Sequence, residues 1–321
     1  MKIGTRSSLM AITQTEHVAA LLMEADPSIE PEIIRRKPRG DLDQVSRLDR
    51  HGGKGGAFVE AIRDAMRAGE LDCAMHSLKD MPGNEETPGL VIAAMLKRDA
   101  IGDALVLHPD HDIDSFLETK AAGLKIGTNA VRRAAYLKRL FPDAEIIHYR
   151  GAADTRIDKL DGRAMQKLPD GGEVGPADAI IAAEIGLHRI GRADRIVHTF
   201  SPDEMLPAIG QGIVAVEAPE TGWRARAALA LIDHPATRIC ADAEREVLWV
   251  LNGHCNSPIA GHAHIEGETM HLKAAVMSLD GSEIIEEEAE GPADEPRALG
   301  RQVALALRDR GGDRLIEETR V

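Results

Sequence analysis

Aromatic residues are scarce in this sequence: Phe, Trp and Tyr make up 2% of its 321 residues. The core must therefore be built from Ala, Val, Ile, Leu and Met. Such a composition suits alternating strands and helices better than an aromatic-rich β-sandwich. The length predicts two or three domains with ample core.

Cysteine is also rare, and long apolar runs are missing. Cys73, Cys240 and Cys255 are far apart and form no Cys-x-x-Cys pair, which excludes a disulfide framework and an obvious zinc site. The first residues lack the apolar region of a signal peptide, and no later run approaches a transmembrane span. We expect a soluble, cytoplasmic protein that is neither exported nor inserted in a membrane.

Positive charge is in deficit, with 39 Lys and Arg against 53 Asp and Glu, for a formal net charge of −14. This balance argues against a general nucleic-acid binder or a membrane-surface binder. It does not exclude a local basic cleft, because net charge says nothing about how the charges are distributed.

The most informative stretch is His76-Ser77-Leu78-Lys79-Asp80, which follows an apolar run over 71–75 and stops before Pro82. The run predicts a short buried strand. In open α/β folds the carboxyl ends of strands face the ligand cleft, so this stretch is a candidate active site. Taken alone, the motif could equally be a polar loop that ends a strand.

The first part of the chain alternates between expected strands at 1–4, 32–36, 71–75 and 90–96 and expected helices at 8–25 and 58–68. Thr5 or Ser7 is the expected N-cap of the first helix. Between the expected strand at 32–36 and the expected helix at 58–68 lies a glycine-rich tip, Gly52 to Gly56, which could cradle phosphate. The tip lacks the Gly-Lys-Ser/Thr ending of a nucleotide P-loop, so a mobile lid is the alternative.

A short internal repeat marks a second unit, because Lys125-Ile126-Gly127-Thr128 copies Lys2-Ile3-Gly4-Thr5. Each copy predicts a strand, a tight glycine turn, a threonine N-cap and a helix with arginine near its start. Helix N-termini favour anions, and arginine binds carboxylates with two parallel hydrogen bonds. Both units are therefore expected to present anion sites.

Arginine in the second unit gathers at the ends of expected elements. Arg132 and Arg133 open a helix, Arg150 and Arg156 flank the loop after a strand at 146–150, and Arg189 follows a strand at 178–183. A solvated helix face would mix arginine with acidic residues along its middle. This placement predicts an anion-binding cleft.

The segment Leu206 to Gly212 leads into an apolar strand that we expect to rejoin the first sheet. Two domains linked by two antiparallel segments could then hinge over a ligand, with Gln211 near the mouth. The remaining chain predicts a small α+β domain with a helix at 237–251, a cysteine loop, an Asp280-Gly281 type I′ hairpin and a helix at 298–308.

The cysteine loop leaves alternatives open. A lone loop cysteine such as Cys255 is most simply an idle thiol. A zinc site from His254, Cys255, His262 and His264 would have unorthodox ligand spacing. An anion receptor or effector-sensing domain would use the same helix N-termini and hinge, but would need neither Asp80 beside Lys79 nor a cysteine domain.

Taken together, the motifs resemble the porphobilinogen deaminase (hydroxymethylbilane synthase) family of tetrapyrrole biosynthesis over nearly the whole chain. The matching segments are Lys2-Ile3-Gly4-Thr5-Arg6 with Ser8 and Gln14, His76-Ser77-Leu78-Lys79-Asp80-Met81-Pro82, Ile126-Gly127-Thr128 before Arg132-Arg133, Arg150-Gly151 before Thr155-Arg156, and Leu206-Pro207-Ala208-Ile209-Gly210-Gln211-Gly212.

The resemblance implies two hinge-linked α/β domains similar to type II periplasmic-binding-protein domains, plus a small C-terminal α+β domain. The expected boundaries are 1–98 with 212–232, then 99–211, then 233–321. It also implies a transferase that joins four porphobilinogen units head to tail onto a dipyrromethane primer, with loss of ammonia. Hydrolysis then releases hydroxymethylbilane. We expect a monomer that binds this small molecule, but no nucleic acid and no membrane.

The resemblance also implies a role for individual residues. Asp80 is the catalytic carboxylate, and Cys255 holds the dipyrromethane cofactor through a thioether. The other expected cofactor-binding residues are Ser77, Lys79, Arg132 and Arg133. The expected substrate-binding residues are Arg6, Ser8, Phe58, Arg150, Arg156, Arg189 and Gln211. No metal is implied.

Several positions depart from the family pattern. The loop around Lys54 is one residue longer, Asn129-Ala130 replaces a serine pair, Ala152 stands where asparagine is common, and His254 replaces a glycine. None of these changes removes the aspartate, the core arginines or the thiol.

Overall fold

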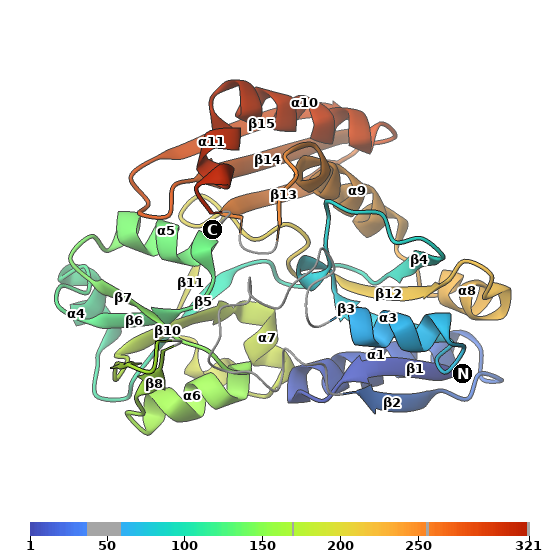
Figure 1. The fold of residues 1–321 in the computed structure, drawn as a ribbon, viewed down its shortest axis with the longest axis horizontal. Helices are drawn as coiled ribbons and strands as arrows, with labels where there is room; N and C mark the ends of the chain where they lie inside the picture. The colour runs from blue at the N-terminus through green and yellow to red at the C-terminus, as the bar shows by residue number, and fades with distance from the viewer. Residues whose placement is uncertain (37–58, 169, 255–256, 320–321) are drawn as a thin grey trace.

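The computed structural model describes residues 1–36, 59–168, 170–254 and 257–319. They form two five-stranded sheets, a three-stranded sheet and a two-stranded ribbon. In Figure 1 the first sheet lies at the N-terminal, blue end, the second lies among the green elements, and the third lies beneath the red C-terminal helices. The predicted fold class, two linked α/β units followed by a small α+β unit, is confirmed.

The first sheet has the order β2-β1-β3-β12-β4. Its strands are β1 Lys2–Arg6, β2 Glu32–Arg36, β3 Cys73–Ser77, β4 Leu90–Met95 and β12 Val214–Pro219. The strands β1, β2 and β3 run parallel, while β12 lies antiparallel between β3 and β4. The accompanying helices are α1 Leu9–Ala25, α3 Glu60–Arg67 and α8 Trp223–Ala230. Aliphatic side chains such as Ile3, Val18 and Val216 fill the core, as the composition predicts.

The second sheet has the order β11-β5-β10-β6-β7. Its strands are β5 Asp103–Leu107, β6 Lys125–Thr128, β7 Glu145–His148, β10 Ala179–Ala183 and β11 His198–Phe200. Its helices are α4 Ile113–Glu118, α5 Val131–Leu140, α6 Ala153–Asp161, α7 Glu184–Arg189 and the 3₁₀ turn η3 Ala193–Arg195. The ribbon consists of β8 Gln166–Lys167 and β9 Glu173–Val174.

Two crossing segments, 98–102 and 210–213, connect these sheets, so the predicted return of the chain to the first sheet is confirmed. The amide of Asp99 donates to the carbonyl of Gly212 at 3.0 Å, which joins the segments side by side. Gly212 has a φ of +86°, and a Cβ there would lie 2.7 Å from the Asp99 carbonyl oxygen. Only glycine fits this close approach without displacing backbone.

The C-terminal unit packs helices on a three-stranded antiparallel sheet. It contains α9 Pro235–Val250, β13 Ile259–Glu266, β14 Thr269–Met277, β15 Ile284–Pro292, α10 Pro296–Asp309 and α11 Gly312–Glu317. The predicted hairpin is present, but the predicted type I′ turn is wrong. Such a turn needs positive φ at both central residues, and here Gly281 has positive φ whereas Asp280 does not. The amide of Gly281 instead closes a turn on the carbonyl of Ser278. Helix α11 was not predicted.

The threonine N-caps expected in the repeat are also wrong. Thr5 remains in β1, is fully buried and donates its hydroxyl to the Ala11 carbonyl, so Ser8 becomes the N-cap of α1. In the second copy Ala130 occupies the N-cap position of α5 and makes no side-chain cap bond. In the first copy β1 runs two residues beyond the expected strand end, to Arg6, and helix α1 begins at Leu9. No helix in the described ranges is both long and apolar enough to span a membrane.

Candidate functional site

The predicted polar stretch lies at the carboxyl end of β3, a strand inside the first sheet. After Ser77 the chain forms a 3₁₀ turn, η2 Leu78–Asp80, and the Leu78 amide donates to the Ile213 carbonyl at 3.0 Å. The buried Leu78 side chain anchors the turn. This arrangement leaves Lys79 partly buried and Asp80 exposed at the end of the strand.

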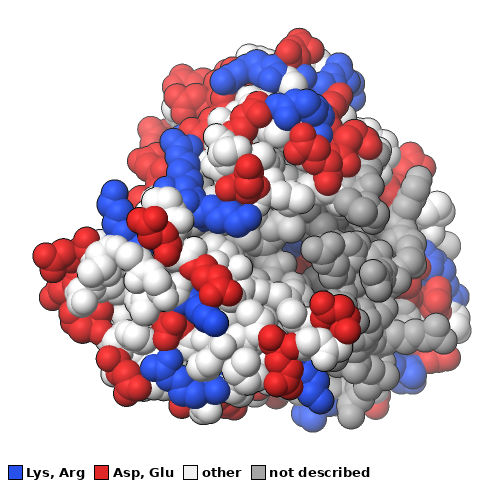
Figure 2. All heavy atoms as spheres, turned by 60° about the vertical axis from the view of Figure 1, so that its left-hand side comes forward, with Lys and Arg blue, Asp and Glu red and all other residues white. Residues whose placement is uncertain are grey.

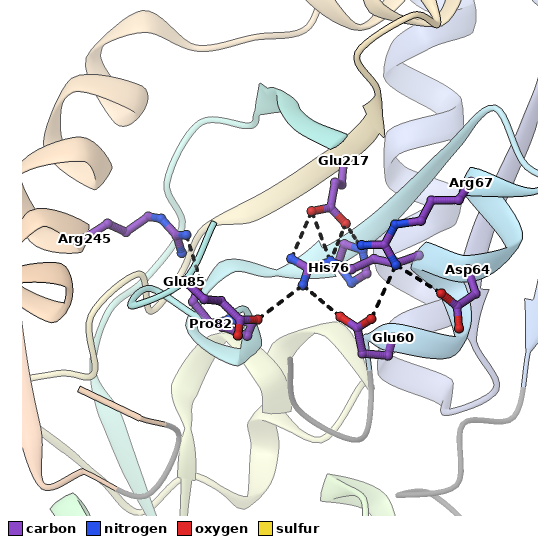
Figure 3. A network of polar contacts seen from close by, with 9 residues as sticks. Glu60, Asp64, Arg67, His76, Pro82, Glu85, Glu217 and Arg245 are labelled. Carbon is purple, nitrogen blue, oxygen red and sulfur yellow. Dashed lines mark hydrogen bonds and ion pairs between the residues drawn. The ribbon is translucent and has the colours of Figure 1, made fainter. Parts of the chain in front are cut away.

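A buried ion-pair network lies around β3 just before this turn (Figure 3). The guanidinium of Arg63 donates to both carboxylate oxygens of Glu217, from Nε to Oε2 and from Nη2 to Oε1, each at 3.0 Å. Both residues are 1% exposed. His76 Nε2 lies 3.6 Å from Glu217 Oε2, and burial together with Arg63 lowers the pKa of His76 to about 3. His76 is therefore a neutral, buried core residue.

Two further contacts fix the ends of the stretch. The Ser77 hydroxyl and the Gln14 side-chain amide lie within hydrogen-bond distance, at 3.2 Å from Nε2 and 3.3 Å from Oε1. At the other end, Arg245 of α9 donates to the carbonyl of Pro82 at 2.9 Å (Figure 3). The stretch is therefore held by α1 on one side and by the C-terminal unit on the other.

The expected cofactor-binding arginines meet at a carboxylate that sequence reasoning missed. Asp103, the first residue of β5, is fully buried and accepts Arg132 Nη2 at 2.6 Å and Arg133 Nε at 2.9 Å. Gln211, also fully buried, donates from Nε2 to Asp103 Oδ1 at 3.1 Å and to the Ile101 carbonyl at 2.7 Å. In the sequence, the only sign of this role for Asp103 was an acidic residue at the start of an apolar run.

Lys79 joins this cluster from the first sheet, because its Nζ donates to Gln211 Oε1 at 3.2 Å. Burial and the nearby Arg133 lower the pKa of Lys79 to about 8, against the opposing effect of Asp80 and Asp103. Burial disfavours a charged Asp103, yet Arg132 and Arg133 outweigh it and hold the pKa of that carboxyl well below its ordinary value. Residues from both sheets thus form one cationic cluster with Asp103 inside it.

The other predicted arginines lie in different settings. Arg156 in α6 is partly buried, its pKa is lowered to about 10 by burial and by Arg133, and its Nε has no partner among the described residues. Arg150 is 7% exposed at the end of the β7 segment. Arg189 pairs with Asp99 of the crossing segment at 2.5 Å. Arg156 therefore lies within the electrostatic reach of Arg133, whereas Arg189 is paired with a protein carboxylate.

For the remaining predicted residues, the structure says less about their expected roles. Arg6 ends β1, and the Ser8 hydroxyl accepts the amide of Ala11 at 3.3 Å as the cap of α1. Phe58, Cys255 and the glycine-rich tip Gly52 to Gly56 lie outside the described residues. On the face shown in Figure 2, blue and red side chains are interspersed. Arg132 and Arg133 are buried.

A second buried carboxylate, Glu244 of α9, joins the C-terminal unit to both crossing segments. It accepts the Gly210 amide and the Ala263 amide, each at 2.8 Å, and it pairs with Arg98. Burial opposes its ionisation, but Arg98 and His262 lower its pKa to about 2. Sequence reasoning did not identify this junction.

The zinc alternative has no geometric support in the part of the chain that is described, where no three His, Cys, Asp or Glu side chains are grouped for a metal. His262 and His264 stack with ring centroids 6.0 Å apart, and His264 stacks on His271 at 4.9 Å. His264 is among the more exposed of these side chains, so the stack lies toward the surface of the C-terminal sheet.

Comparison with known protein families gives two matches. Residues 1–226 match the family model described as "Porphobilinogen deaminase, dipyromethane cofactor binding domain". Residues 238–309 match the one described as "Porphobilinogen deaminase, C-terminal domain".

Full-length relatives agree with these matches. The chain is 38% identical to "Porphobilinogen deaminase" from Stenotrophomonas maltophilia (strain K279a) over 316 residues, covering 98% of each chain. It is 38% identical to the protein of the same name from Xanthomonas axonopodis pv. citri (strain 306), covering 99% of each chain. Among solved structures, the substrate binding domain of a putative molybdenum ABC transporter from Clostridium difficile is 12% identical, with a TM-score of 0.43 over 73% of this chain and 93% of that one.

Proposed function

Because the chain belongs to the porphobilinogen deaminase family, whose transferases carry a dipyrromethane cofactor, we propose the following reaction for it. It joins four porphobilinogen molecules head to tail onto a covalently bound primer, with loss of one ammonia at each addition. Hydrolysis then releases hydroxymethylbilane.

One observation carries the proposal: Lys79, Arg132 and Arg133 converge on the buried carboxylate of Asp103, the two arginines directly and Lys79 through Gln211. Among the described residues, these three cations outnumber the two carboxylates, Asp80 and Asp103, that act on Lys79. Arg156 adds a further cation next to Arg133. Each pyrrole of the proposed ligands carries an acetate and a propionate. Guanidinium groups bind such carboxylates in pairs of hydrogen bonds, so an excess of fixed cations fits a chain of pyrroles.

The residues near the cluster fit the dipyrromethane cofactor as a carboxylate-rich group. We propose that Lys79, Arg132, Arg133 and Ser77 hold its carboxylates and orient it, and that the Cys255 thiol attaches it. When bound, the cofactor supplies the pyrrole carbon to which the first substrate is added. The chain's own contribution is to fix its position and to keep its charges paired.

Asp80 is proposed to act on the reacting substrate. Its carboxylate is exposed at the end of β3, while the backbone of its turn is held by the buried Leu78 side chain and by the bond from the Leu78 amide to the Ile213 carbonyl. A rigidly placed carboxylate beside a pyrrole N–H stabilises the positive charge that develops as ammonia departs. The carboxylate needs no proton transfer for this role.

The proposed substrate-binding set is Arg6, Ser8, Phe58, Arg150, Arg156, Arg189 and Gln211. Of these, Arg189 and Gln211 already have protein partners in Asp99 and Asp103. Binding a substrate carboxylate would require them to exchange or share those partners. Arg156 requires no such exchange at its Nε, which supports it as the first contact for an incoming carboxylate.

We further propose that residues 1–98 with 212–232 form the first domain, residues 99–211 the second, and residues 233–321 the third. The partition of the strands among the sheets supports these boundaries, since β12 returns to the first sheet. A monomeric state, a cytoplasmic location and the absence of nucleic-acid and membrane partners stay predictions.

Intact-mass measurement under denaturing conditions tests the proposed function. The purified protein should carry a covalent mass excess of two pyrrole units on the peptide that contains Cys255. The variant Cys255→Ser should lose both the adduct and the activity, while Cys240→Ala, at a buried cysteine, should keep them. The wild-type protein at its unmodified mass, with no release of ammonia from porphobilinogen, would overturn the proposal.

A further inference from the structure

Asp103 is not among the residues assigned above to cofactor or substrate, yet four of those residues depend on it directly or through one neighbour. We propose that Asp103 is the positioning residue of the carboxylate site. It holds Arg132 and Arg133 in their ligand-receiving orientation and, through Gln211, ties them to Lys79. This inference rests on the proposed function, because the ligand of the cluster is taken from it.

The geometry makes Asp103 a holder of side chains and leaves it little capacity for anything else. Its Oδ2 accepts Arg132 Nη2 at 2.6 Å, and its Oδ1 accepts Arg133 Nε at 2.9 Å, Arg133 Nη2 at 2.7 Å and Gln211 Nε2 at 3.1 Å. Both carboxylate oxygens are therefore occupied, and the residue is fully buried. A carboxylate that is so fully bonded does not reach substrate.

The backbone under Asp103 is fixed by the second sheet. Asp103 lies opposite Ala183 of β10 on one side and opposite Phe200 of β11 on the other. It also follows directly on the crossing segment 98–102, to which Gln211 Nε2 donates at the Ile101 carbonyl. Asp103 thus sets the two guanidinium groups relative to the second sheet, and Gln211 sets them relative to the crossing segments.

The guanidinium groups keep free donors while Asp103 holds them. Arg132 uses Nη1 on the Leu206 carbonyl at 2.8 Å and Nη2 on Asp103, whereas Arg133 uses Nε and Nη2. A guanidinium has five N–H donors, so among the described residues each arginine retains N–H groups for a ligand. The four cations Lys79, Arg132, Arg133 and Arg156 also outnumber the carboxylates of Asp80 and Asp103, which leaves the cluster positive. Asp103 therefore orients the cluster without cancelling its attraction for anions.

The alternative role for Asp103 is competition, in which it occupies the guanidinium groups and ligand must displace it. The two roles predict opposite effects of removing its charge. If Asp103 competes, the variant Asp103→Asn should bind carboxylates more readily. If it positions, the same variant should leave two mutually repelling guanidinium groups without a shared negative charge and with one acceptor oxygen in place of two, so productive binding should weaken.

The test follows cofactor acquisition with time. Apoprotein of the wild type and of Asp103→Asn is incubated with porphobilinogen, and intact-mass spectra sample the fraction that has gained two pyrrole units. We expect acquisition to slow by about tenfold or more in Asp103→Asn, because small misplacements of orienting groups cost factors of this size. Asp178→Asn is the matched control. That carboxylate accepts Arg163 and His111 near the other end of β10 and has no contact with the cluster.

A second variant covers the case in which Asp103→Asn does not fold. Asp103→Glu keeps the charge but moves it by one methylene, so acquisition should again slow although the net charge is unchanged. Equal or faster acquisition in either folded variant would overturn the positioning role. Wild-type apoprotein that never gains the two pyrrole units would instead overturn the proposed function, so the two failures are distinguishable.

Discussion

Lys79 is the residue whose charge state should be most visible in kinetics. Its pKa is lowered to about 8 by burial and by Arg133, so it is charged below that pH and loses its charge as the pH rises through it. Since a neutral amine cannot pair with a carboxylate, we expect kcat/KM for porphobilinogen to fall above about pH 8. A series of kcat/KM measurements from pH 6 to pH 10 records this fall, the alkaline limb of the pH profile.

The variant Lys79→Arg supplies the comparison, because a guanidinium keeps its charge throughout this range. Its absolute rate should be lower, since the contact from Lys79 Nζ to Gln211 changes. Its alkaline limb should nevertheless move above pH 9. The same limb in both proteins would assign the titration to another group.

Asp80 should be sensitive to loss of charge and not only to loss of shape. Asp80→Asn keeps size and hydrogen bonding, so an electrostatic role predicts that single-turnover ammonia release falls by about 10² or more while the melting temperature is unchanged. Asp80→Glu should keep part of the activity. The control is Asp72→Asn, at an exposed carboxylate at the other end of β3. Near-wild-type release in Asp80→Asn would remove the catalytic assignment.

At the scale of residues, the sequence indicates the cations better than their partners. Lys79, Arg132 and Arg133 stand in recognisable motifs, and the structure brings all three together. Asp103 and Glu244 could not be identified in the same way. Each begins or occupies an otherwise ordinary element, and its partners are distant in sequence. Gln211 reaches Asp103, and Gly210 reaches Glu244, only once the chain has folded back through the second crossing segment.

The crossing segments are elements whose backbone geometry can be tested directly. Gly212→Ala should lower the free energy of unfolding and reduce turnover, because φ is +86° and the new Cβ would lie 2.7 Å from the Asp99 carbonyl oxygen. The left-handed conformation alone costs about 1–2 kcal/mol for a non-glycine residue. The close contact with backbone adds to that cost.

The variant Gly69→Ala separates the cost of the left-handed conformation from the cost of the close contact with backbone. Gly69 has a φ of +72° after α3, and a Cβ there meets nothing within 4 Å. Chemical denaturation of both variants should show the smaller loss for Gly69→Ala, with turnover retained. Equal losses in stability and turnover would mean that the approach of the two crossing segments is not constrained at Gly212.

At the scale of elements, many strands and helices were predicted, but β5, β11, α4 and α11 were not, and neither were most element ends. The apolar runs identify β3, β10 and β12 because buried strands need them. The N-cap of α1 was missed because Thr5 stays in the strand and bonds to Ala11, a competition that composition does not reveal. The type of the turn before β15 was predicted wrongly because Asp280 accepts the hydroxyls of Ser278 and Ser282. The reversal therefore spans more residues than a two-residue type I′ turn.

For the whole molecule, the Glu244 junction should contribute to the cooperativity of unfolding. Glu244→Gln leaves Arg98 with a buried, uncompensated charge, so we expect a loss of about 3 kcal/mol or more in the free energy of unfolding. The pKa of Glu244 is lowered from 4.5 to about 2. Its contribution is therefore present above pH 4.5 and is lost as the pH falls toward 2.

Denaturant titrations at pH 7 and pH 3 measure both effects. The difference between wild type and Glu244→Gln should be smaller at pH 3 than at pH 7. Glu246→Gln is the control on the same helix, because Glu246 pairs with a largely exposed Arg301 inside the C-terminal unit and should cost less than about 1 kcal/mol. Equal costs for the two variants would contradict a special role for the junction.

The place of β12 has a further consequence for the order in which a nascent chain can acquire its structure. The second sheet uses strands from one continuous stretch, 103–200, and can form as soon as that stretch has left the ribosome. The first sheet must wait for residues 214–219, because β12 lies between β3 and β4. Until then β3 and β4 lack their common neighbour and present unpaired edges, so the earliest part of the chain is protected later than the second sheet that follows it in sequence.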